Sequence, residues 1–244
     1  MKKIHLVMPM GGKGSRFTEK GFDFPKPLIT IEEKPFFYWS TISITKFIDV
    51  IDITFVVLRE HVEKYDIVTE IHKFFPDAHI HIIPEVLNGA VLTCMEGVKG
   101  IQDEYPIVFN DCDHMFRCHT FEDFIKSDEQ IDGALLTFWS DEAKYSFLRF
   151  DDEGNVAETV EKQVISNDAI CGCYYFSNKE IFQTAAECYL KNCAYNEFFV
   201  SGVYNIMASR GAIIKAFQTD FHLPFGIPEE YKEAQGSEFF KELM

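Results

Sequence analysis

Short apolar runs alternate with helix-length amphipathic segments over the first half of the chain, and this order constrains the fold more than any other feature. The apolar runs have the length of buried strands, and the segments between them repeat apolar residues at helical spacing. The predicted strands are Ile4–Met10, Ile53–Leu58, Ile80–Ile83, Pro106–Phe109 and Ala134–Trp139. The predicted helices are Phe36–Phe47, Val62–Phe75, Ala90–Val98 and Phe121–Ser127. This order predicts a mostly parallel sheet that helices cover on both faces.

The pattern changes from about Tyr145 onwards. Phe147–Phe150 and Val156–Val160 flank an acidic turn that ends in Gly154, which predicts a β-hairpin. The remaining predicted elements are the strands Ile170–Phe176 and Ala212–Phe217 and the helices Ile181–Leu190 and Phe198–Ser209. No Pro-, Ser- or Gly-rich linker separates the halves. We therefore expect one α/β domain over residues 1–244, Rossmann-like, with a mixed, mostly parallel central sheet.

The chain is strongly acidic, with 23 Lys and Arg against 39 Asp and Glu, a formal net charge of −16. This balance argues against nucleic acid and an anionic membrane surface as partners. Any anionic ligand must be met by a local cluster of Lys, Arg or backbone N–H groups. Each basic residue in a glycine-rich loop is therefore informative in this chain.

The N-terminal apolar run is too short for a signal peptide, because Pro9 and two glycines end it. No other stretch approaches the ~18 apolar residues of a membrane span. The seven cysteines are odd in number and form no C-x-x-C pair, which is typical of reduced thiols. We expect a cytoplasmic protein.

A glycine-rich segment, Gly11-Gly12-Lys13-Gly14-Ser15-Arg16-Phe17, directly follows the first predicted strand. Ligands of open α/β sheets bind at the carboxyl ends of the strands, and glycines there let backbone N–H groups approach phosphate oxygens. The spacing fits neither the G-x-x-x-x-G-K-[ST] loop nor the dinucleotide fingerprint, whose third glycine is Phe17 here. Alone, the segment fits a phosphate-binding loop and a glycine turn without a ligand equally well.

A second segment, Pro25-Lys26-Pro27-Leu28, favours the phosphate-binding interpretation. The two prolines lock the backbone on either side of Lys26. Its flexible ammonium group is thereby held at a fixed place, as phosphate binding requires.

Two carboxylates, Asp111 and Asp113, follow the strand predicted over Pro106–Phe109. At positions i and i+2 of a strand end they point the same way. Together they suit Mg²⁺, a hard octahedral cation that also takes triphosphate oxygens and keeps its waters. The alternative is a solvated loop end.

With these residues together, the sequence resembles the nucleotidyltransferases that make sugar nucleotides. The resemblance begins with Gly-Gly-x-Gly-x-Arg, Pro-Lys-Pro-Leu and the helix opened by Lys34-Pro35. Of five later segments, Asn88-Gly89-Ala90 is similar to the family's base-reading loop, and Asn110–Asp113 is similar to the segment with its magnesium aspartate. Glu161-Lys162 with Ser166-Asn167 is similar to the acceptor-binding Glu-Lys-Pro segment, and Gly172–Phe176 is similar to the strand that follows it. Gly226–Glu230 is similar to the closing Gly-Thr-Pro-Glu segment. The matches run from Met1 to about Ala234.

The sequence departs from the family pattern at two places. Gln163 stands where the family usually has proline, and the family's second metal-binding aspartate has no clear match. Leu223-Pro224-Phe225 occupies the place of that aspartate, and Asp220 and His222 are only nearby.

The resemblance implies a nucleotide-binding part at about residues 1–140 and an acceptor-binding part at about 141–244. It implies Arg16 and Lys26 as catalytic residues and Asp113 or Asp111 as the Mg²⁺ ligand. The implied nucleotide-binding residues are Met10, Gly11, Gly12, Gly14, Ser15, Glu85, Asn88, Gly89 and Ala90. The implied acceptor-binding residues are Glu161, Lys162, Asn167 and Glu197. Arg117 is a further candidate cation for an acceptor that bears a carboxylate.

The implied reaction moves a nucleoside monophosphate from a nucleoside triphosphate to a phosphorylated acceptor and releases pyrophosphate. The whole chain looks most like capsule- and lipopolysaccharide-pathway enzymes, which favours CTP with a small non-sugar phosphate such as phosphoglutamine or phosphocholine. The main alternative is UTP or dTTP with a sugar 1-phosphate. A glycosyltransferase and a nucleotide sensor of similar fold are further alternatives. We expect a homodimer, as is common among small family members.

Overall fold

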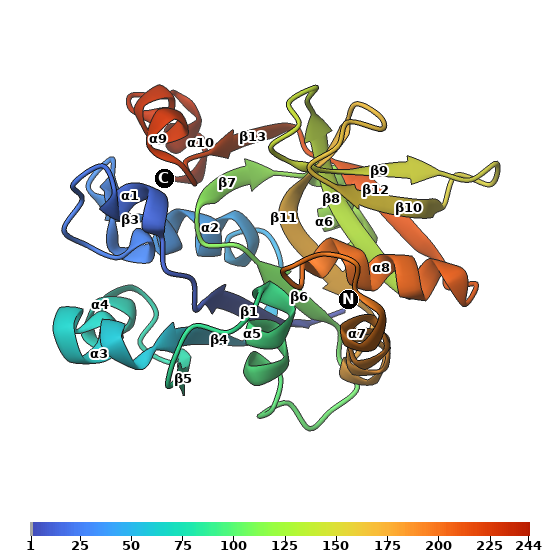
Figure 1. The fold of residues 1–244 in the computed structure, drawn as a ribbon, viewed down its shortest axis with the longest axis horizontal. Coiled ribbons are helices and arrows are strands. Elements are labelled where there is room, and N and C mark those ends of the chain that lie inside the picture. Colours follow the sequence, from blue (N-terminus) through green and yellow to red (C-terminus); the bar gives the residue numbers. More distant parts are fainter. Residues whose placement is uncertain (1) are drawn as a thin grey trace.

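The computed structural model describes residues 2–244, in which nine strands form one central sheet (Figure 1). Its strands are β1 Ile4–Met10, β4 Val50–Leu58, β5 His79–Ile83, β6 Ile107–Asn110, β8 Gly133–Trp139, β9 Ser146–Phe150, β10 Val156–Glu161, β11 Asp168–Phe176 and β12 Ile214–Gln218. The path runs β10-β9-β11-β6-β1-β4-β5, with β8 and β12 branching from β11. Only β10 and β11 run against the other strands of this sheet. The predicted α/β fold with a mixed, mostly parallel sheet is confirmed.

Helices cover both faces of this sheet, as the alternating pattern predicts. The main helices are α2 Phe36–Thr45, α3 Arg59–Tyr65, α4 Ile67–Phe74, α5 Ala90–Gly97, α6 His119–Lys126, α7 Lys179–Asn192 and α8 Val200–Ser209. Side chains of β1 alternate between the faces, so that Leu6 and Met8 join the core under α2, α4 and α6, and Val7 joins the core under α5, α7 and α8. Two apolar layers thus sandwich the sheet.

A third apolar cluster joins the two ends of the chain. It gathers Phe17, Phe36 and Trp39 from the first part of the chain with Phe225 and Phe240 from the last part. The short elements around it are α1 Ser15–Thr18, η1 Lys26–Leu28, β2 Thr30–Ile31, β3 Lys34–Pro35, β7 His114–Arg117, β13 Phe221–Pro224, α9 Pro228–Ala234 and α10 Phe239–Leu243. In Figure 1, α9 and α10 (red) lie beside α1 and β3 (blue). This cluster fixes the C-terminal segment over the carboxyl ends of the strands.

One prediction of local structure is wrong, and one strand pairing was missed. The helix predicted over Val62–Phe75 is two helices, because Asp66 between α3 and α4 adopts a left-handed conformation with φ 50°, which Asp tolerates better than most residues. The antiparallel ladder of β7 with β13 was not predicted. Within residues 2–244, no helix has the length and apolar character that crossing a membrane requires.

A buried histidine ties three segments together at the amino end of β1. His5 is 2% exposed, and its Nδ1 and Nε2 each lie 2.8 Å from a carboxylate oxygen, of Asp52 and Asp103 respectively. Burial alone would lower the pKa of His5, but hydrogen bonds and attraction to both carboxylates raise it above its usual value. The charged imidazolium therefore stabilises the fold.

We expect His5→Gln to remove a pH-dependent part of the stability. Since the folded pKa of His5 is raised, its contribution is complete below the unfolded value of about 6.5 and is lost as pH rises through the folded value. The unfolding free energy of the wild type minus that of His5→Gln, from urea titrations between about pH 5.5 and 8.5, should therefore shrink with pH. Exposed His79 provides the control substitution. A difference that grows with pH would contradict this account.

Candidate active site

The glycine-rich loop leaves the carboxyl end of β1 and packs directly on the Pro-Lys-Pro segment. Gly14 has φ 61°, and a Cβ atom there would lie 2.9 Å from the Cβ of Lys26. A side chain at position 14 would thus be both strained and obstructed. Glycine at this position lets the two motifs, separate in the sequence, form one wall.

Lys26 forms an ion pair with Asp113, which follows β6. Lys26 Nζ lies 2.6 Å from Asp113 Oδ2. Burial alone would lower the pKa of Lys26, but the Asp113 charge raises it above its usual range. Burial would raise the pKa of Asp113, and Lys26 instead lowers it. Both groups are therefore charged at neutral pH.

The neighbouring carboxylate of Asp111 has no such partner. Among residues 2–244, no side chain forms a hydrogen bond or ion pair with it. Its backbone N–H donates to the carbonyl of Gly172, whose φ of +92° bends β11 towards it. Burial and the charge of Asp113 raise the pKa of Asp111 to about 7. A cation placed here would remove both destabilising causes.

Two cavities meet at this cluster. The glycine-side cavity has a volume of about 400 Å³, and the Glu161-side cavity of about 290 Å³. Lys26, Ala90, Asp111 and Asp113 line both. Two ligands bound side by side would therefore meet over one lysine and two carboxylates.

The glycine-side cavity collects most of the predicted nucleotide-binding residues. Its walls include Met10, Gly11, Gly12, Gly89 and Ala90. Gly89 has φ 101°, and a Cβ atom there would lie 2.8 Å from the Cα of Phe198. The other predicted nucleotide-binding residues, Gly14, Ser15, Glu85 and Asn88, do not line this cavity. Gly14 instead packs against Lys26.

The acceptor-binding predictions are placed less uniformly. Glu161 lines the cavity named after it. Glu197 lines the glycine-side cavity instead. Lys162 and Asn167 are exposed and line neither. Arg16, expected beside the triphosphate, lines the Glu161-side cavity.

Several residues of the Glu161-side cavity were missed by sequence reasoning, among them Lys144, Tyr145, Ser146 and Phe199. The cavity is also lined by Tyr174 and Glu230, which lie in segments that resemble the family, and by His222. Lys144 Nζ lies 3.0 Å from Glu142 and 3.1 Å from buried Glu230, which also accepts a hydrogen bond from the Tyr145 hydroxyl. This cluster joins the loop before β9 to α9. The sequence carries no local signal for it, because its members are far apart in the chain.

Two uncharged histidines, His114 and His222, line the Glu161-side cavity. Asn110 Nδ2 donates to the carbonyl of Ser40, so its Oδ1 accepts from His114 Nε2. Burial lowers the pKa of His114 to about 4, so its imidazole is neutral. Its unprotonated Nδ1 then accepts a hydrogen bond from His222 Nε2, at 3.2 Å. Burial also lowers the pKa of His222. Neither histidine therefore supplies a cation to the cavity.

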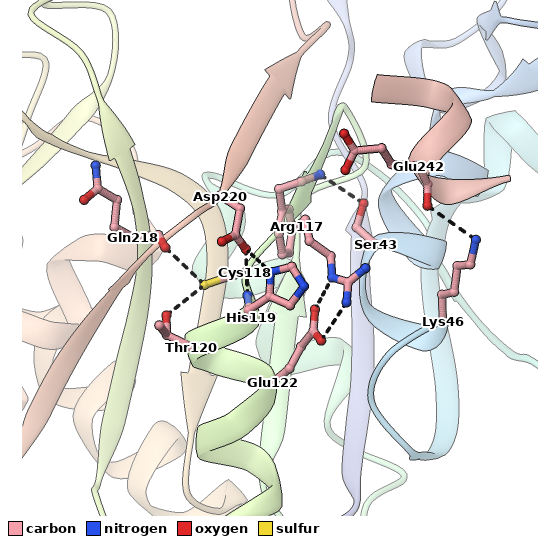
Figure 2. Close-up of polar contacts among 11 residues, drawn as sticks. Ser43, Lys46, Arg117, Cys118, His119, Thr120, Glu122, Gln218, Asp220 and Glu242 are labelled. Carbon is pink, nitrogen blue, oxygen red and sulfur yellow. Dashed lines mark hydrogen bonds and ion pairs between the residues drawn. The ribbon is translucent and has the colours of Figure 1, made fainter. Parts of the chain in front are cut away.

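Asp220 and Arg117 are both engaged away from the cavities (Figure 2). Asp220 Oδ2 accepts hydrogen bonds from the backbone and the Nδ1 of His119, each at 2.8 Å. Arg117 forms two hydrogen bonds with Glu122 and stacks on Phe47, its guanidinium carbon 3.4 Å from the ring centroid. The expectation that Arg117 could bind an acceptor carboxylate is therefore wrong, because Glu122 already neutralises it.

The residues present fit a magnesium ion. Asp111 and Asp113 face the space shared by both cavities, and Asp111 lacks a counter-ion. No group of three or more His, Cys, Asp or Glu that could hold a metal ion occurs in residues 2–244, at this site or elsewhere. Magnesium is commonly held by one or two carboxylates with substrate phosphates and water completing its shell. The donor set therefore matches Mg²⁺ shared with a bound triphosphate.

A family model described as nucleotidyl transferase matches residues 6–233. The chain belongs to the nucleotidyl transferase family. This assignment agrees with the two cavities that meet at Lys26 and the aspartates. No curated protein sequence matches this nucleotidyl transferase significantly.

Solved structures with the same fold include three transferases. The nucleoside-diphosphate-sugar pyrophosphorylase of Vibrio cholerae RC9 has a TM-score of 0.82 at 21% identity, over 95% of this chain and 100% of the other. The inositol-1-phosphate CTP transferase of T. maritima has a TM-score of 0.74 at 16% identity, over 99% and 94%. A UDP-glucose pyrophosphorylase in complex with UDP-glucose has a TM-score of 0.75 at 19% identity, over 99% and 100%. At these identities the likeness establishes the fold.

We expect Gly89→Ala to weaken triphosphate binding at least tenfold and to destabilise the protein by about 2–4 kcal/mol. The left-handed backbone disfavours a side chain, and the added Cβ would push against Phe198. Gly100→Ala is the matched control, because its Cβ would meet nothing within 4 Å. Urea denaturation and calorimetric titration with triphosphate and Mg²⁺ measure the two effects. Unchanged stability of Gly89→Ala would show that the loop is not constrained by Phe198.

Proposed function

We propose that this nucleotidyl transferase moves a cytidylyl group from CTP to a small phosphorylated acceptor that is not a sugar, with release of pyrophosphate. The observation that carries the proposal is the meeting of two cavities at Lys26, Asp111 and Asp113. The glycine-side cavity takes the nucleotide and the Glu161-side cavity takes the acceptor. The reacting phosphates then lie together at the shared wall.

The reaction needs positioning and charge compensation more than proton transfer. An acceptor phosphate already carries ionised oxygens near neutral pH, and one of them attacks the α-phosphorus in line as pyrophosphate leaves. The protein must hold two anions that repel each other and neutralise the charge that develops. Lys26, whose pKa is raised, keeps its positive charge at the shared wall throughout. Arg16 supplies a second cation from the acceptor side.

Asp111 and Asp113 would hold the magnesium ion. When bound, the ion supplies Lewis-acid charge neutralisation to the phosphate oxygens. Asp113 shares its carboxylate with Lys26, so this aspartate positions the lysine as well. The backbone N–H groups of Gly11 and Gly12 complete the phosphate site on the nucleotide side.

The choice of CTP rests on the resemblance of the whole chain to capsule-pathway enzymes and gains support from fold relatives. One of them is described as an inositol-1-phosphate CTP transferase, so this fold accommodates CTP with a non-sugar acceptor. We propose phosphoglutamine or a similar small phosphate as acceptor, and a cytoplasmic homodimer acting in surface-polysaccharide synthesis. A UTP- or dTTP-dependent sugar-1-phosphate transferase is the second candidate, favoured by the UDP-glucose pyrophosphorylase among the relatives.

Pyrophosphate release tests the proposal directly. Purified protein with Mg²⁺ is assayed with CTP, UTP, dTTP, ATP and GTP, each paired with phosphoglutamine, phosphocholine and several sugar 1-phosphates. We expect pyrophosphate from CTP with a non-sugar phosphate. Pyrophosphate from UTP or dTTP with a sugar 1-phosphate would keep the reaction and overturn the substrates. Release of a nucleoside diphosphate from a sugar nucleotide would indicate a glycosyltransferase, and tight triphosphate binding without turnover a sensor.

Lys26→Ala should lower kcat/KM by about 100-fold or more, as expected when a charge donor to the transition state is removed. Exposed Lys20→Ala is the control and should change the rate less than twofold, since it lines neither cavity. Initial rates of pyrophosphate release give both values, and melting temperatures confirm that the variants fold. A loss under tenfold would remove Lys26 from the centre of the mechanism.

A further inference from the structure

The carboxylate of Glu161 lacks a counter-ion at the wall of its cavity. Its Oε1 accepts hydrogen bonds from the hydroxyls of Ser146, at 2.5 Å, and Ser201. Its Oε2 has no protein partner, and no Lys, Arg or His of residues 2–244 forms an ion pair with it. Burial is the main cause that raises the pKa of Glu161. The two hydroxyls fix the carboxylate in place without neutralising it.

Three lysines around Glu161 have other partners. Lys162 is exposed, and its Nζ lies over the ring of Phe199, 5.1 Å from the centroid. Lys144 is held between Glu142 and Glu230. Lys26 is paired with Asp113 at the shared wall. Arg16 lines the same cavity without an ion pair, and no Lys, Arg or His of residues 2–244 forms an ion pair with Glu161.

The walls beside Glu161 are aromatic and apolar. Tyr174 and Phe199 line the cavity together with Ile170 and Val200. The Tyr174 hydroxyl has no hydrogen-bond partner within the described chain, and after burial the charges of Asp111 and Glu161 raise its pKa. Aromatic faces attract cations, most strongly where water is excluded. The aromatic side chains beside Glu161 thus favour a positive group.

The lining of the Glu161-side cavity also includes the cations Lys26 and Arg16. Lys26 lines both cavities, and Arg16, which makes no ion pair in residues 2–244, lines this one. These cations suit a phosphate. Glu161 lines only the Glu161-side cavity, whereas Lys26 lies on the wall shared by both cavities. A ligand of this cavity with its phosphate at Lys26 would therefore extend away from the shared wall, towards Glu161.

We propose that the end of the acceptor remote from its phosphate carries a positively charged amine, which pairs with Glu161. This inference rests on the proposed function of the cavity as the acceptor site. A buried carboxylate without a counter-ion is destabilised, and a cationic ligand restores the missing partner. A neutral hydroxyl at the same position would donate one hydrogen bond to Glu161 and leave the charge uncompensated.

Matched pairs of small phosphates test the inference by binding, without turnover. Calorimetry measures the affinity of 2-aminoethyl phosphate against 2-hydroxyethyl phosphate, and of 3-aminopropyl against 3-hydroxypropyl phosphate. Phosphocholine is included to compare a quaternary with a primary amine. The protein is saturated with Mg²⁺ and a CTP analogue that has a methylene group between the α- and β-phosphorus. Each pair differs only in the charge of its terminal group.

We expect the better amine to bind at least tenfold more tightly than its hydroxyl partner. In Glu161→Gln, which keeps an oxygen for the two serines, this ratio should fall below threefold because the amine loses affinity. Glu158→Gln is the matched control, since Glu158 lies on the same strand but pairs with Arg149 at the surface. There the ratio should stay above tenfold.

Three results would overturn the inference: equal affinities within each pair, no binding by any amine, or an equal loss for amine and hydroxyl in Glu161→Gln. The proposed function fails by a different result, namely no pyrophosphate from any triphosphate with any acceptor. The amine preference could then still be present in the binding data. The two proposals are therefore tested separately.

Discussion

The ion pair between Lys26 and Asp113 is the constraint on which the site depends. It connects the loop after β1 with the loop after β6, two segments that meet only because both strands end at the same edge of the sheet. The backbone carbonyl of Asp113 also accepts a hydrogen bond from Phe225, at 2.9 Å. One aspartate thereby holds Lys26, lines both cavities and anchors the C-terminal segment.

This arrangement leaves the site electrostatically incomplete. Lys26 compensates Asp113, whereas Asp111 and Glu161 face cavities without a cation partner in the described residues. Such groups cost stability in the free protein and become favourable when a ligand supplies the opposite charge. The glycine loop contributes the complementary part, since its N–H groups and Lys26 favour anions. The charges at the two cavities are therefore such that a bound cation and a bound anion would each complete part of the charge balance.

Much of the fold could be predicted because strand burial and helical spacing are local properties of the sequence. The glycine loop and the two aspartates could be placed at the edge of the sheet because each follows a predicted strand, whereas Lys26 was singled out by the prolines on either side of it. The β7–β13 ladder could not, since both strands are short and pair across about a hundred residues of chain. The placing of Glu197 on the side of the glycine-rich loop depends on how helices and loops pack. No local pattern records such packing.

The segment where the family's second metal-binding aspartate is expected shows how packing can replace a ligand. Phe225 is fully buried, and its ring centroid lies 4.6 Å from that of Phe36 in the cluster that joins the two ends of the chain. A carboxylate in its place would lose this aromatic contact and would be buried among apolar rings. At Phe225 the C-terminal segment therefore contributes a hydrogen bond to Asp113 and no carboxylate. A metal ion bound at this site would have Asp111 and Asp113 as its protein carboxylates.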